Sequence, residues 1–83
     1  MSKIIVYSKD VCPYCVRAKM LLQRKGAAFM EIKITDEKIK EEMIKKSGGR
    51  MTVPQIFINE KHIGGFDDLH ALDIVGKLDE LLK

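Results

Sequence analysis

The only two cysteines of this 83-residue chain, Cys12 and Cys15, lie three positions apart in the segment KDVCPYCVRAK, residues 9–19. Cysteines at this spacing can hold a metal, form a structural disulfide or act as a redox pair. A zinc site needs about four ligands, and the only other soft or imidazole donors are His62 and His70, which are too widely spaced. We expect both histidines on the surface, His62 in a turn and His70 in the first turn of a helix, and we predict no metal site.

The redox interpretation makes use of the residues around the cysteines. A disulfide between Cys12 and Cys15 closes a loop too short to constrain much of the unfolded chain, so a purely structural role explains the pair poorly. Cys12 directly precedes Pro13, which suits the first position of a helix. The N–H groups and the dipole at the helix start then favour a Cys12 thiolate and lower its pKa, and Lys9 adds positive charge. Because Cys15 faces the core one turn later, we predict that Cys12 attacks and Cys15 resolves.

Hydrophobic patterning predicts the elements that position this pair. The apolar run KIIVYS, residues 3–8, suits a buried strand, and residues 13–25 fit a helix that ends at Gly26. Residues 29–34, FMEIKI, alternate as a half-buried strand. One side of that strand carries Met30, Ile32 and Ile34. Strand, helix and strand over about thirty residues predict a βαβ unit.

A helix and a hairpin are predicted next. The segment TDEKIKEEMIKKSGG, residues 35–49, is helical in pattern and offers Thr35 or Asp36 as its N-cap. The segment TVPQIFINEKHIGG, residues 52–65, indicates two strands joined by a turn at residues 59–61. The chain therefore continues from the βαβ unit into a helix and a β-hairpin.

The sequence ends in an amphipathic helix that is predicted to start at Asp67 and Asp68. Gly76 lies inside this predicted helix, where a glycine lowers helix stability by about 1 kcal/mol relative to alanine. The apolar stripe that we assign to the core consists of Leu69, Leu72, Val75, Leu78 and Leu82. The predicted fold is therefore one α/β domain of residues 1–83 with a four-stranded mixed sheet.

Composition and charge restrict the class of protein. The chain is 46% hydrophobic and 33% charged with a net charge of +3, which is ordinary for a folded globular protein. It has no Trp, two Tyr and three Phe, so it lacks the aromatic and basic surface typical of nucleic-acid binding. It shows neither a signal-peptide core nor the roughly 18 apolar residues of a membrane span. We expect a cytoplasmic protein that binds neither nucleic acid nor membranes.

Three motifs at these spacings resemble the dithiol glutaredoxins of the thioredoxin-like superfamily. They are Cys-Pro-Tyr-Cys at residues 12–15, Thr-Val-Pro at residues 52–54 and Gly-Gly-Phe-Asp-Asp at residues 64–68. The resemblance covers essentially the whole chain. It implies a monomeric glutathione-dependent thiol–disulfide oxidoreductase with a glutaredoxin fold, with glutathione as reductant and cosubstrate. Its implied protein partners carry disulfides or are glutathionylated, and ribonucleotide reductase is one candidate.

The resemblance also assigns roles to site residues. It makes Cys12 the nucleophile and Cys15 the resolving thiol, places a cis peptide bond before Pro54, and lets the Val53 main chain pair with the glutathione cysteine. Tyr14 flanks the sulfur. The implied ligand-binding residues are Lys9, Tyr14, Thr52, Val53, Pro54, Gly65, Asp67 and Asp68.

The two ends of the tripeptide are assigned to different residues. Lys9 meets the glycyl carboxylate, with Gln55 as a second candidate. The start of the last helix takes the γ-glutamyl carboxylate through its free N–H groups, and Asp68 takes the ammonium. An alternative is that Asp67 and Asp68 only cap the helix.

Two departures from the family pattern and two other functions remain open. Met51 stands where a polar residue is frequent, and Phe66 stands where some members carry an extra cysteine.

One alternative function is that of a redoxin recharged by thioredoxin reductase. The other is a dimer that holds an iron–sulfur cluster through Cys12 and glutathione, as some relatives do; Pro13 is expected to disfavour it by rigidifying the loop.

Overall fold

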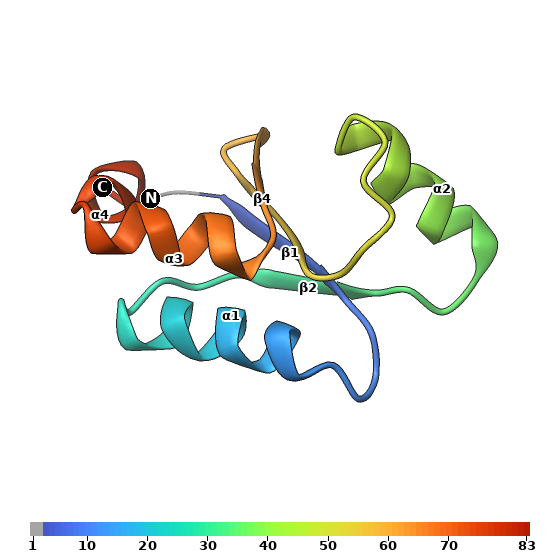
Figure 1. The fold of residues 1–83 in the computed structure, drawn as a ribbon, viewed down its shortest axis with the longest axis horizontal. Coiled ribbons are helices and arrows are strands. Elements are labelled where there is room, and N and C mark those ends of the chain that lie inside the picture. Colours follow the sequence, from blue (N-terminus) through green and yellow to red (C-terminus); the bar gives the residue numbers. More distant parts are fainter. Residues whose placement is uncertain (1–2) are drawn as a thin grey trace.

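A computed structural model describes residues 3–83 of the chain (Figure 1). The first two residues of the predicted domain lie outside the described residues. The helices are α1 (Pro13–Arg24), α2 (Glu37–Lys46), α3 (Phe66–Ile74) and α4 (Lys77–Leu81), and the strands are β1 (Ile4–Ser8), β2 (Met30–Lys33), β3 (Gln55–Ile58) and β4 (Lys61–Gly64). None of the helices formed by residues 3–83 is long and apolar enough to cross a membrane.

The strands form one mixed sheet in the order β2-β1-β3-β4. β2 pairs in parallel with β1, with Ile5 opposite Met30, and α1 makes the crossover between them. β3 runs antiparallel to both β1 and β4. The predicted βαβ unit, the hairpin and the four-stranded mixed sheet are therefore confirmed. The arrangement brings the C-terminal end of β1 next to the first residue of β3, because Tyr7 pairs with Gln55.

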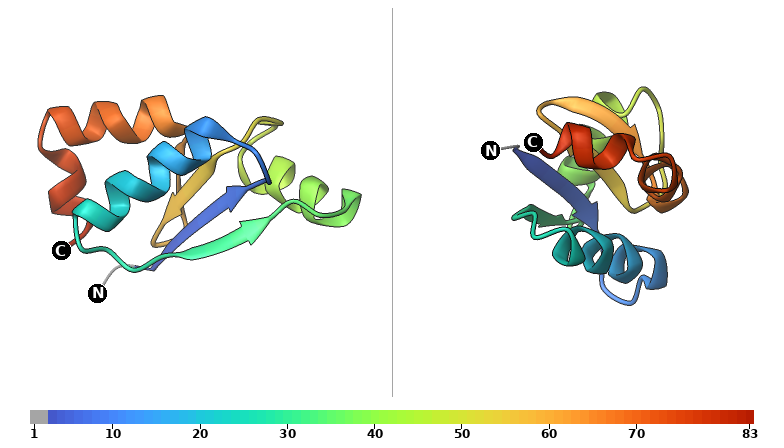
Figure 2. Two further views of the ribbon diagram at one scale, coloured as in Figure 1. Left: turned by 90° about the horizontal axis from the view of Figure 1, so that it is seen from below. Right: turned by 90° about the vertical axis from the view of Figure 1, so that its left-hand side faces the viewer.

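Alternation along β1 divides the apolar residues between two faces of the sheet. Ile4 and Val6 point to the face that α1, α3 and α4 cover, which we call the α1/α3 face (Figure 2). Ile5 and Tyr7 point to the opposite face, which α2 covers and which we call the α2 face. The buried apolar residues of the α1/α3 face are Ile4, Val6, Ala18, Leu21, Leu22, Ile56, Ile58, Leu69 and Leu78.

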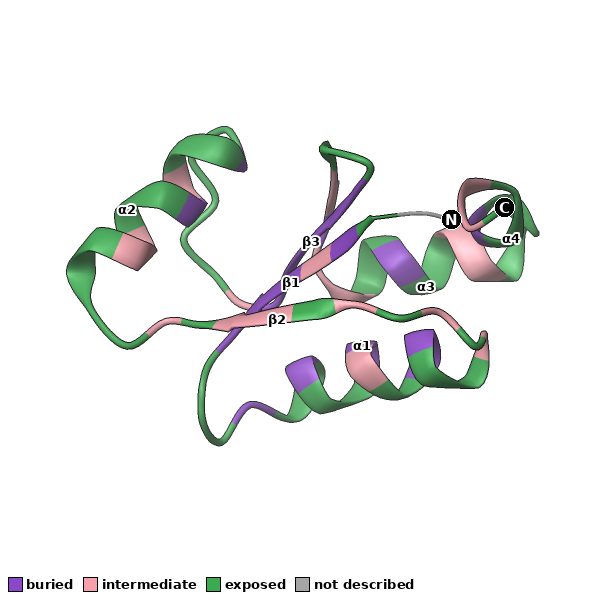
Figure 3. Cartoon of the chain, turned by 180° about the vertical axis from the view of Figure 1, so that it is seen from behind, coloured by how far each residue is buried: buried purple, intermediate pink, exposed green. Residues whose placement is uncertain are grey.

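The α2 face is covered more thinly. Its buried apolar residues are Tyr7, Met43 and Phe57, and partly buried Ile32, Ile34, Ile39 and Ile44 surround them. Four residues of α1 are buried, whereas Met43 is the one buried residue of α2. Figure 3 shows this contrast between α1 and the largely exposed α2. Asp36 is the N-cap of α2 and accepts a hydrogen bond from the Ile39 N–H at 2.9 Å.

The predicted single C-terminal helix is wrong. The chain leaves the helical conformation at Gly76, whose φ of +79° lies in the left-handed region that glycine tolerates. α3 therefore ends at Ile74 and α4 starts a new direction, which buries Leu78. Val75 was assigned to the apolar stripe, but it is 65% exposed at the break.

Two strand predictions also need correction. β3 starts at Gln55 and not at residue 52, because the preceding segment contains a cis peptide bond between Val53 and Pro54 and forms a loop. On β2, Ile32 packs against the α2 face, but Met30, predicted on the same side of the strand, is 60% exposed. β2 is an edge strand and α2 does not extend over its first residue.

Candidate active site

The two cysteines lie at the start of α1. Cys12 is the N-cap residue and forms a disulfide with Cys15, with 5.2 Å between their Cα atoms. Pro13 occupies the first helical turn, and the Cys15 N–H donates to Cys12 Sγ at 3.2 Å. Cys12 is 8% exposed and Cys15 only 1%. The predicted placement at the helix start is confirmed. In the reduced protein, an N–H bond of this kind favours negative charge on Cys12 Sγ.

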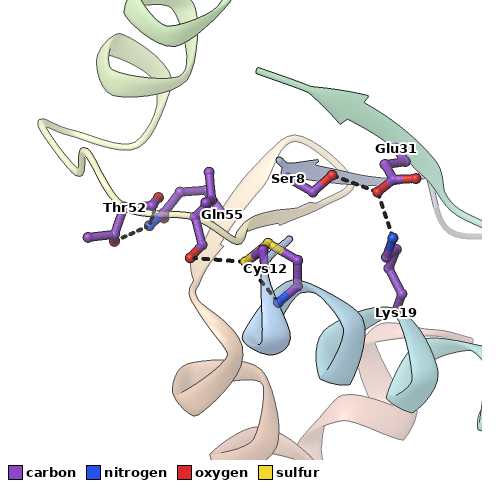
Figure 4. The surroundings of a disulfide bond; sticks show 8 residues. Ser8, Cys12, Lys19, Glu31, Thr52 and Gln55 are labelled. Atoms are coloured by element: carbon purple, nitrogen blue, oxygen red, sulfur yellow. Dashed lines mark hydrogen bonds and ion pairs between the residues drawn. A yellow bond between two sulfur atoms is a disulfide. The ribbon is translucent and has the colours of Figure 1, made fainter. Parts of the chain in front are cut away.

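The segment before β3 reaches the cysteines from the other side. The Val53–Pro54 peptide bond is cis, as the resemblance implied. The carbonyl oxygen of Val53 lies 4.0 Å from Cys12 Sγ. Residues 52–54 therefore form a wall beside Cys12, and we call them the cis-proline loop (Figure 4).

Two surface grooves meet at this loop, and Thr52 and Val53 line both of them. The first, of about 390 Å³, is the Lys9 groove; its other lining residues are Lys9, Ile34, Lys40, Met43 and Met51. The second, of about 370 Å³, is the Asp68 groove. It is completed by Tyr14, Arg50, Pro54 and the four residues 65–68. The structure thus brings all eight predicted ligand-binding residues to the walls of two adjoining grooves.

The Asp68 groove ends at the start of α3. Gly65 is the N-cap residue, and its N–H donates to Asp68 Oδ2 at 3.0 Å. Gly64 has a φ of +124°, and a Cβ at this position would collide with the same Asp68 oxygen. Glycine at residue 64 therefore leaves room for the carboxylate. Capping is performed by the Asp68 side chain, whereas Asp67 is exposed and faces the groove.

Gln55 and His62 do not lie where they were predicted. Gln55, a candidate for the glycyl carboxylate, is fully buried. His62 belongs to β4 and is half-buried, with its ring 5.0 Å from that of Phe57. Its Nε2 lies 2.7 Å from Gln55 Oε1. Burial lowers the pKa of His62, the charge of Arg50 lowers it further, and Asp68 opposes both.

A polar cluster lies beside the disulfide on the other side (Figure 4). Ser8 is fully buried at the end of β1 and donates from Oγ to Glu31 Oε2 at 2.6 Å. Lys19 of α1 contacts the same oxygen at 2.8 Å. The hydrogen bond from Lys19 and then that from Ser8 lower the pKa of Glu31. This cluster ties α1 to β1 and β2 near Cys12.

Sequence reasoning missed two cations in the grooves. Arg50 lines the Asp68 groove, with its Nη2 3.7 Å from Asp68 Oδ2. Lys40 of α2 lines the Lys9 groove. A basic residue four positions before Pro54 was a usable signal for Arg50. No sequence signal pointed to Lys40, because the sequence does not show which of the several lysines of α2 borders a groove.

The remaining predicted residues agree with the geometry. Tyr14 is 53% exposed beside the groove, and its ring centroid lies 6.3 Å from that of Phe66. His70 is exposed on α3, as predicted, and stacks on Phe66. Among residues 3–83, no three His, Cys, Asp or Glu side chains are grouped so as to hold a metal ion. The arrangement is suited to thiol–disulfide exchange, with one partly accessible sulfur and one covered sulfur.

Comparison with known proteins agrees with this chemistry. Residues 4–63 match the family model described as Glutaredoxin. "Glutaredoxin 3" of Escherichia coli K12 is 58% identical over 84 aligned positions, covering 100% of both chains. A solution structure of glutaredoxin from Brucella melitensis has 54% identity and a TM-score of 0.85, covering 98% of this chain and 88% of that one. A crystal structure titled as a buckwheat glutaredoxin–glutathione complex has 34% identity and a TM-score of 0.89, with coverage of 98% and 76%.

Proposed function

The chain belongs to the glutaredoxin family and is a thiol–disulfide oxidoreductase, and on this premise we propose that glutathione is its reductant. Its substrates are then protein disulfides and protein–glutathione mixed disulfides. The buckwheat neighbour, whose title names a glutathione complex, supports the choice of reductant. We further propose that residues 1–83 act as one domain and as a monomer.

The observation that carries this proposal is that the cis-proline loop forms a wall of both grooves. An extended tripeptide that crosses the loop has one end in each groove and its central residue beside Val53. The carbonyl oxygen of Val53 lies 4.0 Å from Cys12 Sγ, so that central residue is also next to the nucleophile. Glutathione carries its sulfur on its central residue. Main-chain pairing of an extended peptide with the Val53 backbone would fix the sulfur in place.

The charged groups of the grooves complement the ends of glutathione. In the Lys9 groove, Lys9 and Lys40 supply positive charge for the glycyl carboxylate. In the Asp68 groove, the N–H groups at the start of α3 suit the γ-glutamyl carboxylate, and Arg50 adds positive charge. Asp68 and Asp67 supply negative charge for the ammonium group. Both ends of the ligand therefore meet opposite charge.

Exchange with a mixed disulfide needs only Cys12. The Cys12 thiolate attacks the glutathione sulfur, a new S–S bond forms, and the protein sulfur leaves as a thiolate that takes up a proton. A second glutathione thiolate then attacks the bound glutathione sulfur, which releases glutathione disulfide and regenerates Cys12. With a protein disulfide, the Cys12 thiolate attacks one of the two sulfurs, which breaks that disulfide, frees the other sulfur as a thiolate that takes up a proton, and links the protein to Cys12. The Cys15 thiolate then attacks the Cys12 sulfur. That step releases the reduced protein and leaves the Cys12–Cys15 disulfide, which two glutathione molecules reduce.

A coupled assay tests the proposal. Reduction of a small glutathione mixed disulfide is followed with glutathione, glutathione reductase and NADPH, and oxidised protein is incubated separately with NADPH and thioredoxin reductase. We expect turnover with glutathione that saturates with the mixed disulfide. Turnover with thioredoxin reductase alone would instead support the redoxin alternative. Visible absorbance after anaerobic purification would support the cluster-binding alternative.

A further inference from the structure

A continuous hydrogen-bond chain leads from β4 to the cis-proline loop. His62 Nε2 lies 2.7 Å from Gln55 Oε1. Gln55 Nε2 donates to the carbonyl oxygen of Thr52 at 3.0 Å and to Thr52 Oγ1 at 3.2 Å. Gln55 is fully buried, so its amide group is shielded from bulk solvent. Thr52 and its neighbours line the proposed glutathione site, whereas His62 has no part in the proposed exchange steps.

The direction of each hydrogen bond in this chain is determined. A peptide carbonyl can only accept, so Thr52 requires the NH₂ group of Gln55 on its side. The amide oxygen of Gln55 must then face His62, and His62 Nε2 must carry a hydrogen. The imidazole is thereby held in the Nε2–H form when it is neutral. A buried amide oxygen without this donor would keep its full desolvation penalty.

We propose that His62 is a positioning residue that holds the cis-proline loop against Cys12 through Gln55. The inference rests on the proposed function, because it concerns how the loop binds glutathione. Gln55 anchors the main chain of Thr52, the residue before Val53. Since Thr52 and Val53 line both grooves, a shift of this anchor changes both ends of the ligand site together.

The surroundings of His62 favour a fixed, uncharged imidazole. Its ring packs on Phe57 of β3, with centroids 5.0 Å apart. Arg50, from the loop before β3, and Asp68, from α3, are the charged groups that act on it, and their effects on its pKa oppose each other. Both are also groove residues. His62 therefore borders the ligand site from behind without lining either groove.

Steady-state kinetics of three variants tests the inference. His62→Leu removes the donor to Gln55, whereas His62→Gln keeps an N–H near the position of Nε2. Lys61→Gln, at the neighbouring exposed residue of β4, is the matched control. We expect KM for a glutathione mixed disulfide to rise about fivefold in His62→Leu, the effect of one lost hydrogen bond. We expect kcat of His62→Leu to stay within about twofold of the value for the unmodified protein. KM should return to the unmodified value in His62→Gln and should not change in Lys61→Gln.

A spectroscopic measurement checks the same contact without glutathione. Long-range ¹⁵N–¹H correlation should show the Nε2–H form of His62 in the unmodified protein. The backbone amide signals of Thr52 and Val53 should move in His62→Leu and return in His62→Gln. Amide signals that stay in place in His62→Leu would overturn the inference.

The two proposals fail in distinguishable ways. If the unmodified protein turns over with glutathione while His62→Leu has an unchanged KM, the positioning role is wrong and the proposed function stands. A rise in KM matched by an equal fall in kcat, without rescue in His62→Gln, would also overturn the positioning role. Such a change would indicate general damage to the fold. If glutathione does not turn over the unmodified protein, the proposed function is wrong, and the amide signals decide whether His62 positions the loop.

Discussion

The two faces of the sheet differ in how deeply they are packed. Among the described residues, nine apolar side chains are buried on the α1/α3 face and three on the α2 face. Each face also has a cluster of one hydroxyl, one Glu and one Lys. Ser8, Glu31 and Lys19 form the half-buried cluster near Cys12. On the α2 face, the Tyr7 hydroxyl lies 3.3 Å from Glu42, which also pairs with Lys46 at the surface.

This difference divides the candidate site in two. The cysteines and the start of α3 belong to helices of the deeply packed face. The Lys9 groove, in contrast, is partly walled by Lys40 and Met43 of α2. Regions with few buried apolar contacts open at lower free energy than the core. On the proposed function, the site therefore combines a rigid half that holds the cysteines with a more compliant half that receives one end of the ligand.

The largest expected effect is at the cysteines of the rigid half. Cys12→Ser should reduce all activity to background, because only the helix-start sulfur receives the Cys15 N–H bond. Cys15→Ser should keep glutathione-dependent cleavage of mixed disulfides and lose reduction of protein disulfides. Parallel assays with both substrate types measure this. Activity of Cys12→Ser toward a glutathionylated substrate would reverse the two roles.

Core truncations compare the two faces directly. Leu22→Ala on the α1/α3 face should lower the free energy of unfolding by about 4 kcal/mol. Met43→Ala on the α2 face should lower it by about 2 kcal/mol, because the thin cover of α2 can collapse around the missing atoms. Denaturant titration measures both variants, and hydrogen exchange of the unmodified protein should show faster opening of α2 than of α1. A larger loss for Met43→Ala would contradict the contrast between the faces.

Contacts in the Asp68 groove should contribute more to binding of the ligand than contacts in the Lys9 groove. Asp68→Ala is expected to raise KM for a glutathione mixed disulfide about fivefold, because its carboxylate is held by the Gly65 N–H. Lys9→Ala should raise KM less. Lys9 is exposed, and the conformational entropy lost when its side chain is ordered on the ligand offsets more of the energy of that contact. The control is alkylation of Cys12 by a small neutral reagent, which should be unchanged in Asp68→Ala. A stronger effect at Lys9 would place the main anchor in the compliant half.

The smallest effect concerns the two polar clusters. The pKa of Glu31 is lowered in the folded protein by Lys19 and then Ser8, so its stabilisation is present above the ordinary pKa of 4.5 and disappears as pH falls through the lowered value. Glu31→Gln should therefore cost about 1 kcal/mol at neutral pH. The loss should vanish in acid. Glu42→Gln, at the surface, should cost less, and urea titrations across pH measure both. Equal losses would show that burial of the cluster has no effect.

Most of the fold could be predicted from local pattern. Pro13 after Cys12, the β-branched run of β1 and the turn before Lys61 are signals of short range, and the structure agrees with them to within a few residues. The errors arose at Gly76, at the start of β3 after the cis-proline loop, at Met30 of β2 and at His62, which lies in β4. A glycine in an apolar helical stripe can continue a helix or end it, and the choice depends on whether Leu78 reaches the core. That is decided by tertiary packing.

The candidate site could be predicted where its residues belong to motifs. Lys9, Tyr14 and Asp68 were located through the resemblance and lie at the grooves. Gln55, a candidate for the glycyl carboxylate through the same resemblance, is fully buried, and a motif match does not say which of its residues neighbouring segments cover. Arg50 was missed because its nearness to Asp68 joins residues from different elements. Convergence of this kind depends on the register of the sheet and not on any local pattern.

The strand order also determines how the sheet meets other molecules. β2 and β4 are its edges, each four residues long. β2 carries Glu31 and Lys33 at its edge, and Lys33 pairs with Asp10 at 3.0 Å; β4 opens with Lys61. Short, charged edge strands resist pairing with the edge of another copy. The sheet that supports the cysteines therefore has built-in protection against edge-to-edge aggregation.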